Sequence, residues 1–179
     1  MQVNKALSLI LLSLSTTILL SNDMKNAIES PFAAFIIKDD LLPPIQQYTM
    51  PNNCVSNDQD VVSRGLFLFH NLNSKNNPDN IPEGLNQVSS NNSIKQYGNC
   101  VACHNIENAI GYGDIGPDLH NYKTLYIQSG VRSSQYVYQK IADPRFDNLE
   151  THMTINLTNG LMSEREICDI TSYILSEKK

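Results

Sequence analysis

The chain has 179 residues with 18 acidic and 13 basic side chains, and its formal net charge at pH 7 is −5. No cluster of lysine or arginine forms a phosphate-binding stripe, so the charge pattern argues against a nucleic-acid partner. The length suffices for one domain after removal of a leader. Four cysteines are present, and their spacing is informative about chemistry.

Residues 1–21 are typical of an export signal. Lys5 gives a short basic region, and residues 6–20 form an apolar run that is short for a membrane span. We expect cleavage after Ser21, although Leu19 fits the small-residue rule poorly, and an uncleaved anchor is the alternative. The leader therefore predicts a periplasmic protein whose mature form has no membrane span.

Residues 22–57 are predicted to form an extended N-terminal arm, because four prolines interrupt them: Pro31, Pro43, Pro44 and Pro51. The first helix is predicted over residues 58–72, with Asp58 as its N-cap. Gly65 lies inside this helix, where a glycine costs about 1 kcal/mol relative to alanine. We interpret it as the point at which another helix crosses closely.

Three further segments are predicted downstream. Residues 73–97 are rich in Asn, Ser and Pro and are expected to form a long loop. A short helix is predicted over residues 133–142, which Asp-Pro ends. Residues 163–176 give the clearest helix, because Ser163 and Glu166 form the S-x-x-E capping box. This last helix is the expected partner of the first.

The motif C-x-x-C-H occurs at Cys100, Cys103 and His104, and it is the attachment signature of a c-type haem. Two thiols at this spacing reach the two vinyl groups of one porphyrin, and the following imidazole becomes the proximal iron ligand. A redox dithiol needs no histidine at that position. A zinc site would need a second Cys/His pair, which the isolated Cys54 and Cys168 do not supply.

A glycine-rich run over residues 111–119 follows the motif and contains Gly116-Pro117. A proximal histidine normally donates its second ring N–H to a carbonyl, which fixes the orientation of the ring. The carbonyl of Pro117 is our candidate acceptor for His104. An ordinary Gly-Pro turn is the alternative.

The sixth ligand of the iron has five candidates: His70, His120, His152, Met153 and Met162. His120 follows the proximal turn, His70 lies in the first helix, and Met162 directly precedes the last helix. Met153 lies in a loop whose backbone is free to turn a thioether onto the iron, and a thioether suits an electron acceptor. This reasoning favours Met153 and leaves His152 and Met162 as alternatives.

The order of these features resembles the class I cytochrome c family: Gly65 with Phe69, residues 100–104, residues 116–119, a loop methionine and a capped C-terminal helix. Within that family, residues 98–104, 113–119 and 138–145 look like SoxX, the monohaem subunit of the SoxAX cytochrome of sulfur oxidation. The resemblance implies an all-α fold with the cytochrome c domain at residues 58–179.

The resemblance also implies site residues. Cys100 and Cys103 would bind one haem c covalently, with His104 and Met153 as axial ligands. In the family a proline usually follows the ligand methionine, whereas here Thr154 does.

The implied function is that of the electron-accepting subunit of SoxAX. That complex oxidatively couples thiosulfate to a cysteine of the SoxYZ carrier, catalysis is expected on the SoxA haem subunit, and the electrons leave to a soluble cytochrome c. We find no separate nucleophile or acid–base pair in the sequence, so no catalytic residue is assigned. A free monohaem shuttle between respiratory complexes and a gas-binding haem sensor are the alternatives.

Cys54 precedes the first helix and Cys168 lies in the last. Because those two helices are expected to cross, and because an oxidising compartment permits disulfides, we predict a Cys54–Cys168 bridge. Two unpaired buried thiols are the alternative.

Overall fold

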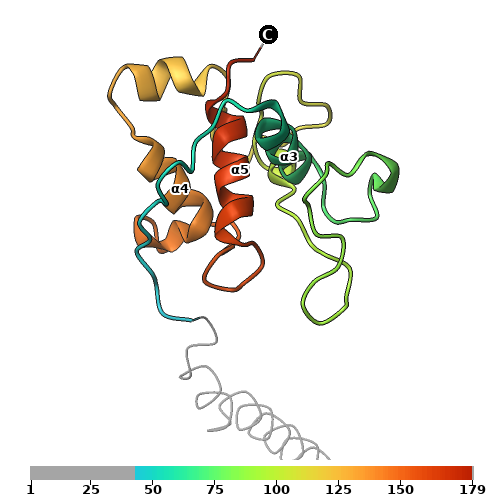
Figure 1. Ribbon diagram of the computed structural model, residues 1–179. Coiled ribbons are helices and arrows are strands. Elements are labelled where there is room, and N and C mark those ends of the chain that lie inside the picture. Colours follow the sequence, from blue (N-terminus) through green and yellow to red (C-terminus); the bar gives the residue numbers. More distant parts are fainter. Residues whose placement is uncertain (1–42, 179) are drawn as a thin grey trace, which may run out of the picture. The chain divides into compact units, whose positions relative to one another are not determined.

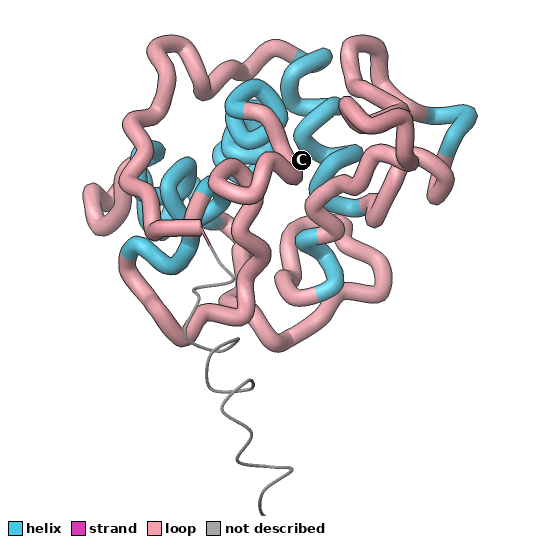
Figure 2. The backbone as a smooth tube through the Cα atoms, turned by 90° about the horizontal axis from the view of Figure 1, so that it is seen from below, coloured by secondary structure: helices cyan, strands magenta, loops and turns pink. Residues whose placement is uncertain are grey.

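The computed structural model of the chain describes residues 43–178. The predicted signal at residues 1–21 and the arm up to residue 42 lie outside the described residues. From Pro44 onward the described residues belong to one compact unit, which includes the last part of the expected arm. Figure 2 shows short helices joined by long loops, with no strand among residues 43–178, so the fold is all-α as predicted. None of the helices within this range is both long and apolar enough to cross a membrane.

Helix α3 (Gln59–His70) confirms the first predicted helix. Asp58 is its N-cap, and its Oδ1 accepts a hydrogen bond of 2.8 Å from the backbone N–H of Asp60. The helix ends two residues before the predicted limit because the side chain of Asn71 donates to the carbonyl of Phe67 over 2.9 Å. Its side chains Phe67, Leu68 and Phe69 are buried in the core.

Helix α5 (Glu164–Leu175) confirms the last predicted helix and its capping box. The backbone N–H of Ser163 donates to Oε2 of Glu166 over 2.7 Å, and Oγ of Ser163 accepts from the N–H of Glu166 over 3.3 Å. These two bonds satisfy groups that a helix start otherwise leaves unpaired.

Helices α3 and α5 pack against each other at the centre of the molecule (Figure 1). A Cβ placed on Gly65 would lie 2.0 Å from the carbonyl oxygen of Asp169 and 2.7 Å from Cβ of Tyr173, so the crossing requires glycine. Beside it, Arg64 and Asp169 form a buried two-point ion pair, with Nε–Oδ2 at 2.8 Å and Nη2–Oδ1 at 3.1 Å. The close crossing inferred from Gly65 is therefore confirmed.

Replacing Gly65 by alanine tests this crossing. Alanine adds about 1 kcal/mol of helix propensity, but separating two packed backbones costs about 1–3 kcal/mol, so we expect a net loss of stability. Chemical denaturation of Gly65→Ala would measure it, with Ser63→Ala on the exposed face of α3 as the matched control. A Gly65→Ala protein at least as stable as Ser63→Ala would contradict the packing described.

Helix α4 (Ser134–Ala142) confirms the short predicted helix. Oγ of Ser133 accepts from the N–H of Tyr136 over 3.2 Å, and Val137, Tyr138 and Ile141 are buried against the core. Asp143 ends the helix, and the 3₁₀ turn η4 (Pro144–Phe146) follows. The π-helical segment η3 (Lys123–Gln128), which precedes α4, was not predicted.

Two glutamines of α4 hold the extended segment that precedes α3. Gln139 accepts from the N–H of Tyr48 over 2.7 Å and donates to the carbonyl of Gln46 over 3.0 Å. Gln135 likewise accepts from the N–H of Met50 over 2.7 Å and donates to the carbonyl of Tyr48 over 2.8 Å. The two side-chain amides therefore pair with the segment as a neighbouring strand would.

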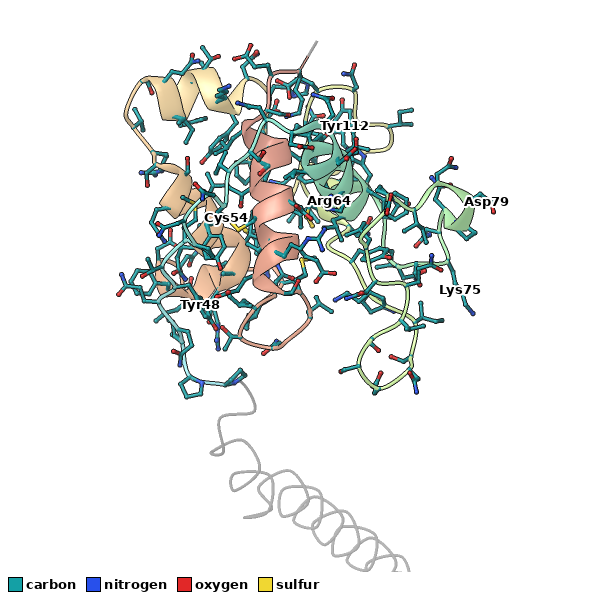
Figure 3. All side chains as sticks on the ribbon, viewed as in Figure 1. Tyr48, Cys54, Arg64, Lys75, Asp79 and Tyr112 are labelled. Carbon is teal, nitrogen blue, oxygen red and sulfur yellow. A yellow bond between two sulfur atoms is a disulfide. The ribbon has the colours of Figure 1, made fainter. Side chains whose placement is uncertain are left out.

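The same segment is also joined to α5 covalently. Cys54 and Cys168 form a disulfide whose Cα atoms are 4.9 Å apart, and Figure 3 shows its yellow bond beside α5. The hydroxyl of Ser172 lies 2.8 Å from the carbonyl oxygen of Cys168 and 3.2 Å from that of Cys54, so its proton is shared between them, and its Oγ accepts from the N–H of Ser56 over 3.1 Å. The connection is thus both covalent and hydrogen bonded.

The 73–97 loop contains the 3₁₀ turn η1 (Pro78–Asn80) and is anchored at its end to the domain. Nζ of Lys95 lies 3.1 Å from Oε2 of Glu166 and 2.8 Å from the carbonyl of Leu161, and Tyr97 is buried. The loop thus leads directly from the core into the C-x-x-C-H motif.

Candidate haem-binding site

The C-x-x-C-H motif forms one tight turn attached to the end of α3. Cys100–Ala102 make the 3₁₀ turn η2, entered through Asn99 at a φ of 45°. The N–H of Asn99 donates to the carbonyl of Asn71 over 3.2 Å, and the N–H of His104 donates to the carbonyl of Cys100 over 2.9 Å. Both thiols and the imidazole are therefore presented from a single turn, as attachment to one porphyrin edge requires.

The side chain of His104 is held by the run that follows it. Its Nδ1 lies 2.8 Å from the carbonyl oxygen of Pro117, the acceptor named in the sequence analysis, and donates a hydrogen bond to it. The ring is buried, with 7% exposure of the residue. Because Nδ1 is occupied, Nε2 is the nitrogen available to a metal, and the Pro117 carbonyl fixes the tautomer and the orientation of the ring.

Three glycines make room around the motif. A Cβ on Gly116 would lie 2.4 Å from Cε1 of His104, and one on Gly113 would lie 1.9 Å from the carbonyl oxygen of Ala102. A Cβ on Gly98 would lie 2.8 Å from Sγ of Cys100 and 3.0 Å from Cε of Met162. The backbone at Gly116 therefore runs directly against the imidazole of His104.

We expect Gly116→Ala to disturb His104 without disturbing haem attachment. The added methyl group would overlap the imidazole, so the ring must rotate or the backbone must shift, at a cost of about 1–3 kcal/mol. Haem content of the denatured protein should stay at the wild-type level, while electron paramagnetic resonance of the ferric protein should report altered axial ligation. Ile110→Ala, at a side chain that is 92% exposed, is the control and should match wild type in both measurements. Unchanged ligation in Gly116→Ala would contradict the steric role of Gly116.

The alternatives to haem attachment are less compatible with this geometry. Burial raises the pKa of the Cys100 thiol to about 12, whereas catalytic redox dithiols have a lowered thiol pKa. Cys54 and Cys168 are joined to each other, so they are not available as further zinc ligands. Cys100 and Cys103 are the cysteines without a disulfide in the described part of the chain.

The candidates for the sixth ligand lie in different environments. His70 contacts the hydroxyl of Tyr173 at 3.1 Å, and His120 contacts Oδ1 of Asp118 at 2.6 Å, so both imidazoles already have partners. Met162 is 2% exposed and packs in the core beside Cys100, a proximity that the sequence analysis did not anticipate. The glycine two residues before Cys100 was the available signal for that contact.

The two remaining candidates lie in the loop before α5. His152 is exposed, and Met153 is half-buried with its backbone N–H bonded to Oγ1 of Thr151 over 3.2 Å. The structure records no side-chain hydrogen bond for Met153, and its loop carries no regular structure around it. A thioether in this position can move without breaking a helix.

The residues present fit a covalently bound haem. Two unbridged thiols and one imidazole with a free Nε2 share a turn, and the missing side chain of Gly116 leaves room for the ring of His104. When bound, haem c supplies a one-electron iron couple that the axial ligands tune. The chain's own contribution is to fix the two sulfurs and the imidazole relative to one another.

Comparison with known proteins agrees with this geometry. The family model described as Cytochrome c matches residues 92–178, a range that runs from the end of the long loop through α5. No curated protein matches the chain significantly. Residues 92–178, just under half of the chain, therefore match a cytochrome c domain. Together with the all-α fold of the described residues, the match indicates a haem electron-transfer protein of the class I cytochrome c type with covalently bound haem c.

Proposed function

We propose that the protein is the electron-accepting subunit of a SoxAX-type complex in the periplasm, with one haem c. Cys100 and Cys103 form the thioether bonds, and His104 and Met153 are the axial ligands. The buried imidazole held by Pro117 supports the proximal assignment. The irregular loop around Met153 supports the distal assignment, since the other candidates are hydrogen bonded, packed in the core or exposed.

The run at residues 138–145 carries the assignment to SoxX, because the other matching motifs occur in cytochromes c generally. Tyr138 and Asp143 are 0% exposed, and Arg145 is 8% exposed. Arg145 donates to Asp143 through Nε over 2.9 Å and through Nη2 over 2.7 Å. The run is therefore an integral part of the core.

The proposed role follows from the balance of the reaction. Joining thiosulfate to a carrier thiol forms one sulfur–sulfur bond and releases two electrons and a proton. The bond is expected to form on the partner subunit, because the unbridged thiols in the described residues, Cys100 and Cys103, are assigned to haem attachment. This chain would receive the electrons one at a time and pass them to a soluble cytochrome c.

The test is stopped-flow absorbance of the mature, haem-loaded protein. We expect thiosulfate to reduce its haem only when a SoxA-type subunit and the SoxYZ carrier are both present. Reduction by a respiratory partner, with no response to thiosulfate in the complete mixture, would overturn the proposal and favour a free shuttle. Rapid carbon monoxide binding to the ferrous protein would instead favour a sensor.

Export can be tested on the same preparation. We expect the intact mass of the periplasmic protein to correspond to cleavage after Ser21, plus one haem and minus the two hydrogens of the disulfide. A mass that retains residues 1–21 would contradict a cleaved leader.

A further inference from the structure

Tyr173 of α5 and His70 of α3 form a hydrogen-bonded pair where the two helices pack together. The hydroxyl of Tyr173 lies 3.1 Å from Nε2 of His70, and Tyr173 is 2% exposed. Burial raises the pKa of Tyr173 to about 12 and lowers the pKa of His70 from its ordinary value of 6.5. Both groups are therefore uncharged at neutral pH, so the phenol O–H donates and Nε2 accepts.

The imidazole acceptor distinguishes Tyr173 from the other buried tyrosines of the described residues. The hydroxyl of Tyr97 donates to the backbone carbonyl of Asn86 over 2.9 Å, and the hydroxyl of Tyr138 has no hydrogen-bond partner. A carbonyl oxygen does not take up a proton near neutral pH, whereas an imidazole does. Tyr173 therefore has a base within the reach that proton transfer needs, which Tyr97 and Tyr138 lack.

A polar cavity beside the pair can receive a proton. Its volume is about 220 Å³, which is enough for water, and it is lined by Leu66, His70, Glu107, Asn108, Tyr173 and Lys178. His70 and Glu107 thus share one cavity, so an imidazolium formed at His70 would have a carboxylate and solvent nearby. A proton accepted from Tyr173 is not trapped in the core.

The charges that face the pair act in opposite directions. Nζ of Lys178 lies 4.4 Å from the ring centroid of Tyr173, and a cation over a ring opposes the loss of an electron from it. The carboxylate of Glu107 counteracts this, and its charge also raises the pKa of Lys178, which burial lowers to about 8. Lys123 is paired with Glu177 over 3.0 Å. One carboxylate therefore balances the one ammonium on the Tyr173 ring.

The last turn of α3 connects the pair to the haem-binding motif. The ring of Phe69 is 1% exposed and packs edge-on against Tyr173, with 5.5 Å between the ring centroids. The carbonyl of Leu68 accepts a hydrogen bond of 3.2 Å from the N–H of Gly98, two residues before Cys100. A continuous path of packed and hydrogen-bonded groups therefore runs from Tyr173 to the motif.

We propose that Tyr173 and His70 act as a proton-coupled one-electron donor, which supplies one of the two electrons that a peroxide removes at the haem site. Reduction of hydrogen peroxide to two molecules of water takes two electrons and two protons. One electron comes from the iron and one from the ring of Tyr173, while solvent supplies the two protons. As the ring is oxidised its O–H bond breaks and the proton moves to Nε2 of His70, which leaves a neutral tyrosyl radical and an imidazolium. The pair thereby keeps the second oxidising equivalent away from the porphyrin.

The experiment mixes the ferric, haem-loaded protein with hydrogen peroxide and records electron paramagnetic resonance of rapidly frozen samples. Wild type should give a tyrosyl radical, and Tyr173→Phe should lose it. His70→Gln should lose it too, because an amide accepts the phenol hydrogen bond but cannot take up its proton. Tyr97→Phe, which removes a buried hydroxyl bonded to a carbonyl, is the matched control and should keep the signal.

The pH dependence in wild type separates proton transfer from packing. Because the pKa of His70 lies below 6.5, the imidazole becomes protonated as the pH falls through that lowered value and can then no longer accept. The radical formed per peroxide consumed should therefore decline on acidification, in wild type and Tyr97→Phe alike. Wild type that consumes peroxide without a tyrosyl radical, a full signal in Tyr173→Phe, or a full signal in His70→Gln would each overturn the inference. None of these results bears on the SoxAX-type role, which the response to thiosulfate tests.

Discussion

Replacing Asp143 by asparagine is expected to lower the free energy of unfolding by about 3–5 kcal/mol, because it removes the carboxylate from a buried ion pair with Arg145. Asp143 is 0% exposed and its carboxylate accepts from Arg145 at both oxygens, over 2.9 Å and 2.7 Å. Oγ1 of Thr158 donates to it over 2.8 Å, and the N–H of Gln46 donates over 3.3 Å. One carboxylate therefore connects α4, the loop before α5 and the N-terminal segment.

The same network predicts how stability depends on pH. Burial alone would raise the pKa of Asp143, but hydrogen bonds from Arg145, Thr158 and the backbone outweigh it and lower the pKa to about 2. Because the folded-state pKa lies below the unfolded value near 3.9, the contribution is complete above that value and is lost as the pH falls toward 2. The difference between wild type and Asp143→Asn should therefore shrink over this range.

Urea denaturation at pH 7, 4 and 3 would measure both effects. Asp147→Asn is the matched control, since its pair with Lys140 is partly exposed and exposed pairs contribute roughly 0–1 kcal/mol. Arg145→Met combined with Asp143→Leu removes the buried charge along with its partner and should recover part of the loss. A cost no larger than that of Asp147→Asn would contradict the central role of Asp143.

The helices of the fold could be predicted because their signals are local. The capping box of Ser163 and Glu166 and the caps Asp58 and Ser133 each lie within one turn of the groups they satisfy. The crossing at Gly65 could also be inferred, since an interior glycine has few other uses in a helix. The C-terminal limit of α3 was misplaced by two residues, because the side chain of an asparagine ended the helix early, and that of α5 by one.

Features that depend on tertiary contacts were not accessible to the same reasoning. The hydrogen bonds of Gln135 and Gln139 with the N-terminal segment join residues far apart in sequence, and no local sequence pattern predicts them. The π-helical segment η3 has no capping signal. Likewise, the position of Met162 near Gly98, on the same side as Cys100, depends on how α5 enters the core. The donor set of Cys100, Cys103 and His104, by contrast, is evident from spacing alone.

Removal of the Cys54–Cys168 disulfide is expected to lower the free energy of unfolding mainly by raising the conformational entropy of the unfolded chain. Replacing Cys54 and Cys168 together by alanine should lower the free energy of unfolding by about 5 kcal/mol, the value that chain entropy predicts for a loop of this order. The two residues are separated by 114 positions, so the bridge closes a loop that spans most of the described chain. Guanidinium denaturation of the haem-loaded protein gives the measurement.

The native contacts around the bridge are expected to survive its removal. Ser172 would still hold the segment at Cys54 and Ser56, so the folded structure changes little and the effect falls mainly on the unfolded ensemble. Wild-type protein treated with dithiothreitol is the matched control: thioethers resist thiol reduction, so it should lose the disulfide, keep its haem and match the double variant. If the reduced protein and the double variant unfold at the same denaturant concentration as the oxidised protein, the bridge does not restrain the unfolded chain. The hydrogen bonds of Ser172, Gln135 and Gln139 would then have to account for the attachment of the segment before α3.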